Sequence, residues 1–402
     1  MFSPAAEQVD RASLLIKDLS SLQTSLLETG DSTRQEMIAK ARALISTLEA
    51  PMESILWMGW AEPARTATIR ISIDIGLFEK LAADDGKAKN SQQLADATKT
   101  DSALIGRMLK HLASMFIIRE TLQDTYAPTA LSNALTDQIF YDGVIFTFDA
   151  QLPSHARLPA YLRSTNHIIP TDDSVFKYSH KSELGIFEWI AADPRMQTAF
   201  QNHMAGYSMG RPHWMDDGFY PVTERLRGVG EGEVLIVDVG GATGHDLAEF
   251  HDKAPTMSGR LILQDQAQAI SSIQEGDRPG IECTVHDFFT PQPVRGAKAY
   301  YMHSVLHDWS DDNARKILTQ LKEALKPEHS KILINENVVG DRDADWKITS
   351  LDWTMMVCLG SCERTETQWR DLVGSVGLKI SGIWKGEGAT ESLIEVVLAD
   401  DA

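Results

Sequence analysis

Residues 234–244 combine an apolar run, an acidic residue and a cluster of glycines, a composition suited to holding a ligand. Residues 234–237 are apolar without alternation, as a strand covered on both faces of a parallel sheet requires. Glycines allow the backbone to approach a ligand where a Cβ would collide. The glycines after Asp238 are Gly240, Gly241 and Gly244. The segment therefore predicts a cofactor site at the end of a buried strand.

A dinucleotide with a pyrophosphate fits this turn poorly. If Gly240 opens a G-x-G-x-x-G fingerprint, its second and third glycines fall on Ala242 and His245. We therefore expect a nucleotide-like cofactor without phosphates.

Polar residues follow the next strand-like runs, and their chemistry suits adenosine. Ligands of such sheets lie beyond the carboxyl ends of the strands. Asp265 can accept hydrogen bonds from ribose hydroxyls, and Asp287 and Phe288 can meet an adenine through its amino group and ring face. Each acid alone can be a turn former or a cap, but their recurrence at successive strand ends favours a binding site. His303 and His307 follow the fourth run.

From Glu233 onward the sequence alternates between strand and helix patterns, which predicts an α/β fold with a Rossmann-like, doubly wound sheet. Two later runs flank a glycine-containing connection and predict a C-terminal antiparallel hairpin at the edge of the sheet. The expected strands are residues 234–239, 261–264, 282–285, 297–302, 331–335, 378–384 and 392–398.

Up to about Met204 the chain is mostly helical, which predicts two domains, residues 1–205 and 206–402. Residues 91–98 and 101–112 have helix-turn-helix spacing, and β-like pieces near residues 117–120 and 126–128 complete a winged helix. The second helix offers only three basic groups, Arg107, Lys110 and His111. A role in packing or dimerisation is therefore favoured over recognition of DNA. Prolines between Pro153 and Pro170 interrupt the helical pattern and predict a loop.

The formal net charge of −19 and the pI near 5.0 argue against nucleic acid or an anionic membrane as the main partner. Three cysteines without metal-type spacing indicate reduced thiols. The N-terminal residues show no signal peptide, and no apolar stretch is long enough to span a bilayer. We expect a soluble, cytoplasmic protein.

On these residues the chain resembles the S-adenosylmethionine-dependent small-molecule O-methyltransferases of the caffeate type, in their plant and fungal forms. The resemblance covers most of the chain. Its carriers are residues 237–244, 263–265, 286–288, 306–310 (Leu-His-Asp-Trp-Ser), 334–336 and 363–365 (Glu-Arg-Thr). It implies S-adenosylmethionine as cofactor, S-adenosylhomocysteine as product, and a homodimer formed through a helical N-terminal domain that also covers the substrate.

The resemblance assigns His307 as the general base, flanked by Glu336 and Glu363. A phenol with a pKa near 10 is a poor nucleophile at neutral pH, and an imidazole within hydrogen-bond reach can take its proton. The two glutamates are suited to hold the ring and stabilise imidazolium. This chemistry needs no metal.

A metal at His303 and His307 is the alternative, because they stand four residues apart with acids behind them. The segment His-Ser-Val-Leu-His lacks the glutamate of H-E-x-x-H, and residues 310–312 (Ser-Asp-Asp) are typical of a helix N-cap. We therefore expect no metal. His303 stands where plant members commonly carry a lysine near the cofactor, and it is expected to contact the cofactor.

By the same resemblance, an aromatic and methionine lining suits a flat, hydrophobic acceptor. The residues expected to bind it are Phe200, Met204, Tyr207, Met355, Cys358 and Asp308. Side chains of these types at helical spacing are also common in cores.

The sequence therefore predicts an O-methyltransferase that acts on a hydroxyl of an aromatic or polyketide-like metabolite. One alternative is a methyltransferase-like enzyme that binds the same cofactor but catalyses dehydration or a pericyclic rearrangement. Another is a winged-helix regulator that senses a metabolite, which the acidic charge disfavours. The identity of the acceptor is not encoded in any motif.

Overall fold

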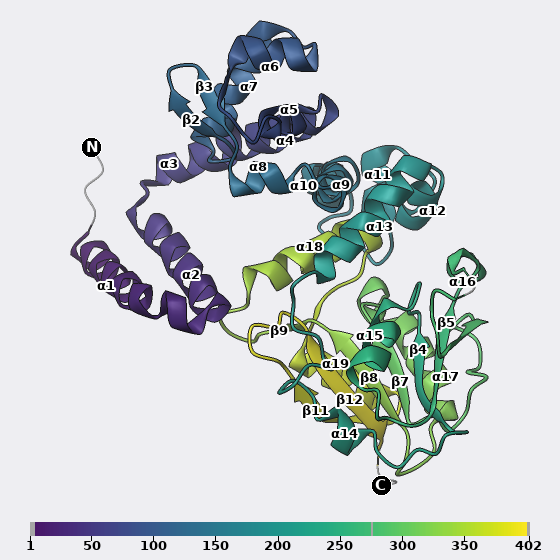
Figure 1. Cartoon of the computed structure of the whole chain (residues 1–402). Coiled ribbons are helices and arrows are strands. Elements are labelled where there is room, and N and C mark those ends of the chain that lie inside the picture. The colour runs from purple at the N-terminus through teal and green to yellow at the C-terminus, as the bar shows by residue number, and fades with distance from the viewer. Residues whose placement is uncertain (1–4, 275, 400–402) are drawn as a thin grey trace. The chain divides into compact units, whose positions relative to one another are not determined.

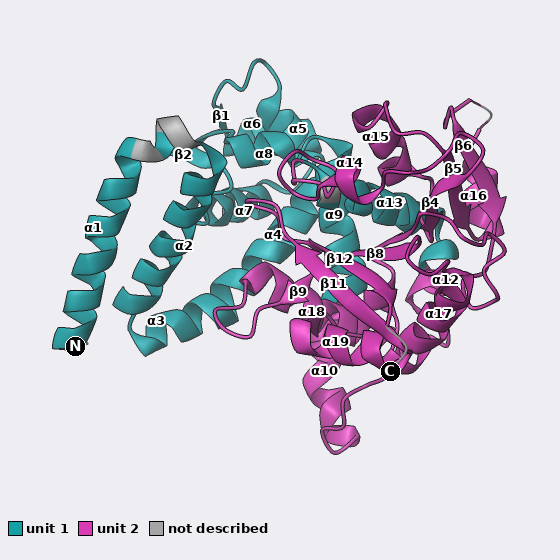
Figure 2. Cartoon of the chain, turned by 90° about the horizontal axis from the view of Figure 1, so that it is seen from below, with its two compact units in different colours: residues 1–152, 190–209 teal, residues 153–189, 210–402 magenta. Residues whose placement is uncertain are grey.

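The computed structural model describes residues 5–274 and 276–399, and the chain divides into two compact units. Unit 1 comprises residues 1–152 and 190–209, and unit 2 comprises residues 153–189 and 210–402 (Figures 1 and 2). Unit 1 is mainly helical, and unit 2 contains the large sheet.

Unit 1 begins with two long helices, α1 (Ala6–Thr29) and α2 (Asp31–Leu48), which pack against each other. Gly30 joins them at φ 63°, a conformation that favours glycine. A run of helical segments follows: α3 (Pro51–Leu56), the π-helix η1 (Trp57–Ala61), α4 (Glu62–Asp74) and α5 (Leu77–Ala82). No helix in the described ranges is long and apolar enough to cross a membrane.

The predicted winged helix is confirmed within unit 1. Its two helices are α6 (Ser91–Thr98) and α7 (Ser102–Ser114), and each begins at a side-chain cap, Asn90 for α6 and Asp101 for α7. A three-stranded sheet forms the wing, with the order β1 (Lys89–Asn90), β3 (Thr125–Ala127) and β2 (Arg119–Leu122).

The remaining helices of unit 1 include α8 (Ala130–Ala134), α9 (Gln138–Phe146), the π-helix η2 (Thr147–Gln151) and α13 (Pro194–Ser208). Helix α9 packs along α13. Asp142 of α9 is buried and bonds Arg195 and Asn202 of α13, so a charged hydrogen-bonded group joins the two helices.

The prediction of a loop between Pro153 and Pro170 is wrong over most of its length. Helix α10 (Leu152–Ser164) includes both Pro153 and Pro159. A regular helix would place the ring of Pro153 against the carbonyl of Asp149, and Asp149 lies within the wider π-turn η2. Only the stretch before α11 (Ser174–His180) is irregular, and α12 (Ile186–Ala191) follows.

The α/β prediction is confirmed by a seven-stranded sheet in unit 2, in which every predicted strand is present. Its order is β11-β12-β8-β7-β4-β5-β6. Strands β4 to β8 run parallel, and β11 and β12 form the antiparallel hairpin at the edge. The strands are β4 (Val234–Val239), β5 (Arg260–Asp265), β6 (Ile281–Val285), β7 (Ala299–His303), β8 (Lys331–Glu336), β11 (Leu378–Trp384) and β12 (Ser392–Leu398).

Helices and a short strand pair complete unit 2. The helices are α14 (Val222–Arg225), α15 (His245–Lys253), α16 (Ala267–Ser272), α17 (Asp311–Ala324), α18 (Trp346–Leu359) and α19 (Glu366–Ser375). The 3-10 turn η3 (Leu306–Asp308) follows β7, and β9 (Val338–Val339) pairs in parallel with β10 (Arg364–Thr365).

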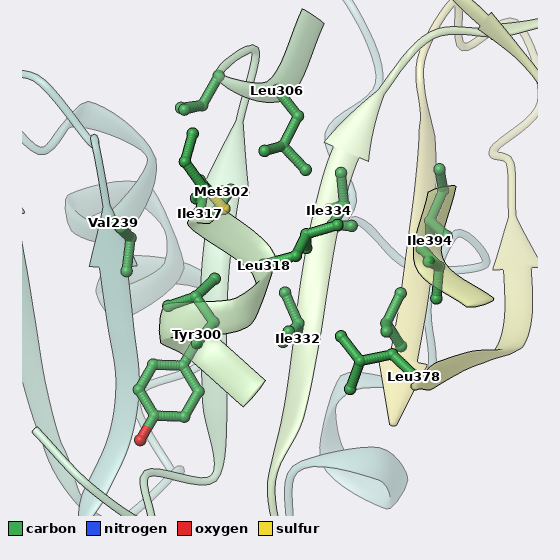
Figure 3. Close-up of a cluster of buried hydrophobic side chains, with 14 of the residues drawn as sticks. Val239, Tyr300, Met302, Leu306, Ile317, Leu318, Ile332, Ile334, Leu378 and Ile394 are labelled. Atoms are coloured by element: carbon green, nitrogen blue, oxygen red, sulfur yellow. The ribbon is translucent and has the colours of Figure 1, made fainter. Parts of the chain in front are cut away.

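Hydrophobic side chains cover both faces of the sheet, because successive strand residues point to opposite faces. On β8, Ile332 and Ile334 join the cluster that contains Ile317 and Leu318 of α17, whereas Leu333 joins the cluster on the other face. Figure 3 shows the first cluster, and Leu306 of η3 belongs to it. The turn that carries His307 is therefore anchored in the core by its neighbour.

Candidate active site

His307 lies in the turn η3, directly beyond the carboxyl end of β7, and it is only 8% exposed. Its Nδ1 is 2.7 Å from Oε1 of Glu363 and 3.5 Å from Oε2 of Glu336, while its Nε2 is 3.5 Å from Oδ1 of Asp308. The structure thus brings together the three residues predicted to carry the chemistry. Asp308, predicted to bind the acceptor, lies on the Nε2 side of the ring.

The two glutamates reach the ring from different elements. Glu336 ends β8, and its Oε1 accepts hydrogen bonds from the backbone N–H groups of Val305, Leu306 and His307 at 3.1, 2.8 and 3.3 Å. Glu363 precedes β10, and its own N–H donates to Asp352 of α18 at 2.9 Å. Glu336 therefore orients the turn, and Glu363 orients the ring.

Burial and neighbouring charges raise the pKa values of His307, Asp308 and Glu336. Burial disfavours the imidazolium, but the carboxylates of Glu336, Asp308 and Glu363 outweigh burial and raise the pKa of His307 to about 10. Burial, with the neighbouring charge of Glu363, raises the pKa of Asp308 to about 6 and that of Glu336 above its usual range. A buried imidazolium stabilised by carboxylates is suited to exchange a proton with an acidic hydroxyl.

The glycine turn after β4 forms a close-fitting cradle. A Cβ on Gly241 would lie 2.2 Å from Oδ2 of Asp238, so a side chain at this position would collide with that carboxylate. A Cβ on Gly240 would lie 3.0 Å from Val305 and 3.6 Å from the ring of Phe288. Gly240 and Gly244 have φ values of 79° and 76°, which favour glycine. The glycine turn, Phe288 and Val305 therefore lie together, and Val305 stands two residues before His307.

Asp238 is the unsatisfied group of this cradle. It is 1% exposed, and neither of its carboxylate oxygens has a hydrogen-bond partner among the described residues. Burial raises the pKa of Asp238 well above its usual range. A buried acceptor that lacks a hydrogen-bond donor destabilises the folded state. A bound ligand that donates to Asp238 would remove this penalty.

Asp265 and Asp287 differ in what they bond. Oδ2 of Asp265 accepts the N–H of Ala242 at 2.8 Å, which ties the end of β5 to the glycine turn. Asp287 is exposed, and its Oδ1 accepts the N–H of Phe289 at 3.0 Å, as a turn former does. The ring of Phe288 is half-buried beside the turn.

Both ring nitrogens of His303 are bonded to carboxylates of the protein. Nδ1 lies 2.5 Å from Oδ2 of Asp246, and Nε2 lies 3.1 Å from Oε2 of Glu391. Tyr301 also donates to Asp246, at 2.8 Å. Burial disfavours the charged ring, but the two carboxylates raise the pKa of His303 well above its usual range. His303 therefore forms an ion-pair network next to the sheet, and its predicted role toward the cofactor stays a prediction.

Apart from Asp308 of η3, the residues predicted to bind the acceptor lie on two helices. Met355 and Cys358 are on α18 of unit 2, which contacts η3, and Cys358 is buried. Phe200, Met204 and Tyr207 are on α13 of unit 1, where the ring of Phe200 lies 5.2 Å from that of Phe146.

Several residues near the site carry no signal that identified them in the sequence. Asp246 is an ordinary first-turn acid of α15, and Glu391 and Asp352 lie in unremarkable segments. Arg364 stands inside the Glu-Arg-Thr segment, which was the one available signal. These residues act over long sequence separations, so spacing alone does not reveal them.

Comparisons with known proteins identify relatives of this chain. Residues 165–379 match a family model of the O-methyltransferase domain, and residues 64–138 match the O-methyltransferase dimerisation domain. The chain is similar to the O-methyltransferase mpaG' of Penicillium brevicompactum, with 37% identity over 391 residues that cover 96% of this chain and 98% of that protein.

Two solved structures share the fold over nearly the full length. One is LepI in complex with S-adenosylmethionine, with a TM-score of 0.85, 27% identity, and coverage of 96% of this chain and 99% of that chain. The other is described as a pericyclic reaction enzyme, with a TM-score of 0.84, 26% identity, and coverage of 96% and 100%.

Proposed function

The chain belongs to the O-methyltransferase family, and we propose that His307 acts as its general base, without a metal, on a hydroxyl of an aromatic or polyketide-like small molecule. Its cofactor is S-adenosylmethionine, and its activity is O-methyl transfer. The proposal depends mainly on one observation, the buried His307 ring held through Nδ1 by Glu363.

The cradle around the glycine turn fits S-adenosylmethionine. Asp238 offers two buried oxygens that lack donors, Asp265 follows the next strand, and Phe288 offers a ring face. The cofactor, when bound, supplies a methyl group on a positively charged sulfur. Asp238, Asp265 and Phe288 would hold it. The carboxylate of Asp265 already accepts the N–H groups of Ala242 and Gln266, so a ribose hydroxyl would use its remaining acceptor capacity.

The proton chemistry belongs to His307. Its pKa of about 10 is close to that of a phenol, about 10 in model compounds, so a proton passes between the two groups at little cost. In one route a neutral phenol gives its proton to Nε2, while the N–H at Nδ1 remains hydrogen-bonded to Glu363. In the other route the acceptor arrives as a phenolate and pairs with a His307 ring that is already protonated. Both routes give the same oxygen nucleophile beside an imidazolium.

We infer that this chemistry needs no metal. Nitrogen and oxygen atoms of His307, Glu336 and Glu363 lie within 4.8 Å of one another, a grouping able to hold an ion. However, Nδ1 of His307 lies 2.7 Å from Oε1 of Glu363, a hydrogen bond that requires a proton between the two atoms, and an ion on that nitrogen would displace this proton. Dialysis against a chelator is expected to leave turnover unchanged, and a loss of turnover restored by a divalent metal would overturn the inference.

We also propose that the protein is a cytoplasmic homodimer and that it does not bind nucleic acid. The dimerisation domain and the exposed apolar side chains of α1 to η1 support a second copy of the chain as partner. On α7, Lys110 is paired with Glu120, which leaves little free basic charge for DNA. Three free cysteines suit a reducing compartment. In this proposal residues 1–205 dimerise and contribute to acceptor binding, and residues 206–402 bind the cofactor.

The rival function is a rearrangement or dehydration of the acceptor without methyl transfer, which the similarity to a pericyclic reaction enzyme favours. Incubation with methyl-labelled S-adenosylmethionine and a pool of candidate phenols separates the two. We expect label in a small-molecule product and formation of S-adenosylhomocysteine in equal amount. An altered product that carries no label, with the donor unconsumed, would support the rival instead.

A further inference from the structure

Arg364 is a fully buried cation that contacts the backbone on both sides of His307. It is 1% exposed, and its guanidinium carbon lies 5.2 Å from the centre of the Trp369 ring. Its Nη1 donates to the carbonyl of Leu306 at 2.9 Å, and its Nη2 donates to the carbonyl of Trp309 at 2.9 Å. Its Nε donates to Asp311, in the first turn of α17, at 3.0 Å. The planar guanidinium thus serves three acceptors around one short turn.

The turn η3 is held by opposite charges at its two ends. Glu336 accepts the N–H groups at the start of the turn, and Arg364 donates to carbonyl groups within and after it. An anion at the N–H end and a cation at the C=O end both stabilise the dipole of a helical turn, and they satisfy groups that the short turn leaves unpaired. The backbone of His307 is therefore fixed from both directions.

Arg364 also links the backbone of the base to the residue that orients its ring. Glu363 is the preceding residue, and Arg364 pairs with Val338 in the two-stranded sheet of β9 and β10. The ring contact at Nδ1 and the clamp on the turn therefore originate from consecutive residues. A change in the position of one must move the other.

We propose that Arg364 is a positioning residue for methyl transfer, which holds the His307 turn in register with Glu363. The inference rests on the proposed role of His307 as the base. Arg364 acts through the turn and touches neither the acceptor nor the cofactor in this scheme. A misplacement of about 1 Å at a reacting group can reduce a rate on the order of 100-fold, so loss of the clamp should appear in kcat.

The experiment compares Arg364→Met, Arg364→Lys and His307→Ala with a matched control, Arg225→Met. Arg225 also pairs with a buried carboxylate, Glu395, and lies over a tryptophan ring, Trp384, in the same unit. None of these contacts of Arg225 involves η3. Turnover is measured at a temperature where circular dichroism shows each variant folded, and the Kd for S-adenosylmethionine is measured by calorimetry.

We expect Arg364→Met to lower kcat about 100-fold, with the Kd for S-adenosylmethionine within threefold of wild type. Arg364→Lys should have a kcat about tenfold higher than that of Arg364→Met and about tenfold lower than that of wild type. An ammonium can reach one carbonyl but not all three acceptors. Arg225→Met should lower the unfolding midpoint and leave kcat unchanged.

An unchanged kcat in Arg364→Met, beside an inactive His307→Ala, would overturn the positioning role alone. A joint loss of kcat and cofactor affinity that matches the loss of stability would also overturn it, in favour of a purely structural role. If Arg364→Met does not fold, the proposal is tested with Arg364→Lys alone. A kcat of Arg364→Lys equal to that of wild type would contradict the proposal. An active His307→Ala would instead contradict the proposed base.

Discussion

Oε1 of Glu363 lies 2.7 Å from Nδ1 of His307, although 56 positions separate the two residues in the chain. The contact places a carboxylate against one nitrogen of the imidazole and leaves the other nitrogen, Nε2, available for the proton exchange that we propose. The same carboxylate helps to raise the pKa of His307 to about 10, against the opposing effect of burial. Glu363 thus orients the His307 ring and, together with Glu336 and Asp308, raises its proton affinity.

Replacing His307 by Ala is expected to reduce kcat by about 100-fold to 10,000-fold, the usual contribution of a general base. The Kd for S-adenosylmethionine should stay within threefold, because the glycine turn and Asp265 are untouched. Single-turnover transfer of labelled methyl and calorimetry test the two parts. His329→Ala is the control, since His329 precedes β8 at the opposite end of the strand from Glu336. Wild-type turnover by His307→Ala would rule out this mechanism.

Glu363→Gln should shift the pH dependence of kcat/KM. The Glu363 carboxylate raises the pKa of His307, so its loss lowers that pKa and the neutral imidazole is present at lower pH. The rising limb of the profile is expected to move to lower pH by about 1 unit or more, while kcat falls because the ring is less well oriented. A limb that stays in place or moves to higher pH would show that His307 is not the group that titrates.

Asp265→Ala is expected to weaken cofactor binding without a comparable loss of chemistry. The variant removes the acceptor of the Ala242 N–H and the carboxylate available to the ribose. We expect the Kd for S-adenosylmethionine to rise about tenfold to 100-fold, equivalent to about 1.4 to 2.8 kcal/mol, with kcat at saturating cofactor within threefold. The control is Asp312→Ala in the exposed first turn of α17. An unchanged Kd in Asp265→Ala would remove this residue from the cofactor site.

The N-terminal helices should carry the dimer contact. Leu14 is 60% exposed and Ile45 is 56% exposed, and other apolar side chains of this segment are also exposed. The double variant Leu14→Asp and Ile45→Asp is expected to convert the dimer to a monomer, which light scattering coupled to size exclusion would detect as a halved mass. Val285→Asp, at the exposed end of β6 in unit 2, is the control. A double variant that stays dimeric would place the interface elsewhere.

Glu395→Gln should destabilise the fold at neutral pH. Burial raises the pKa of Glu395, but hydrogen bonds from Arg225, Tyr220, Ser381 and Lys331 outweigh burial and lower it to about 2. The folded state therefore binds fewer protons than the unfolded chain, whose glutamate pKa is about 4.3. The stabilisation is complete above that value and is lost as the pH falls toward 2.

Loss of one partner of a buried pair costs about 3–5 kcal/mol, so the urea midpoint of Glu395→Gln should fall at pH 7. The difference from wild type should shrink between pH 5 and pH 3. A difference that is constant over this range would show that the charge of Glu395 contributes no stability.

Local patterns in the sequence were sufficient for every strand of the large sheet and for the individual motifs, but not for helix α10. The apolar run before Asp238 predicted β4, and the glycines predicted the turn where a Cβ on Gly241 would collide with Asp238. These features depend on side-chain period and on backbone conformation within a few residues, which the sequence displays directly. Helix α10 was not predicted, because Pro153 and Pro159 interrupt the local helical pattern.

Tertiary structure decided which residues meet. His303 contacts Glu391 across 88 positions, and Arg364 reaches the carbonyl of Leu306 across 58. Asp287 and Asp265 are equivalent acids after successive strands. Both bond their own turn, but only Asp265 also bonds the glycine turn of the neighbouring strand. Such contacts depend on strand order, on register and on the packing of loops from distant segments. The sequence thus determined which groups the protein possesses, and the fold determined their partners and so their charges and proton affinities.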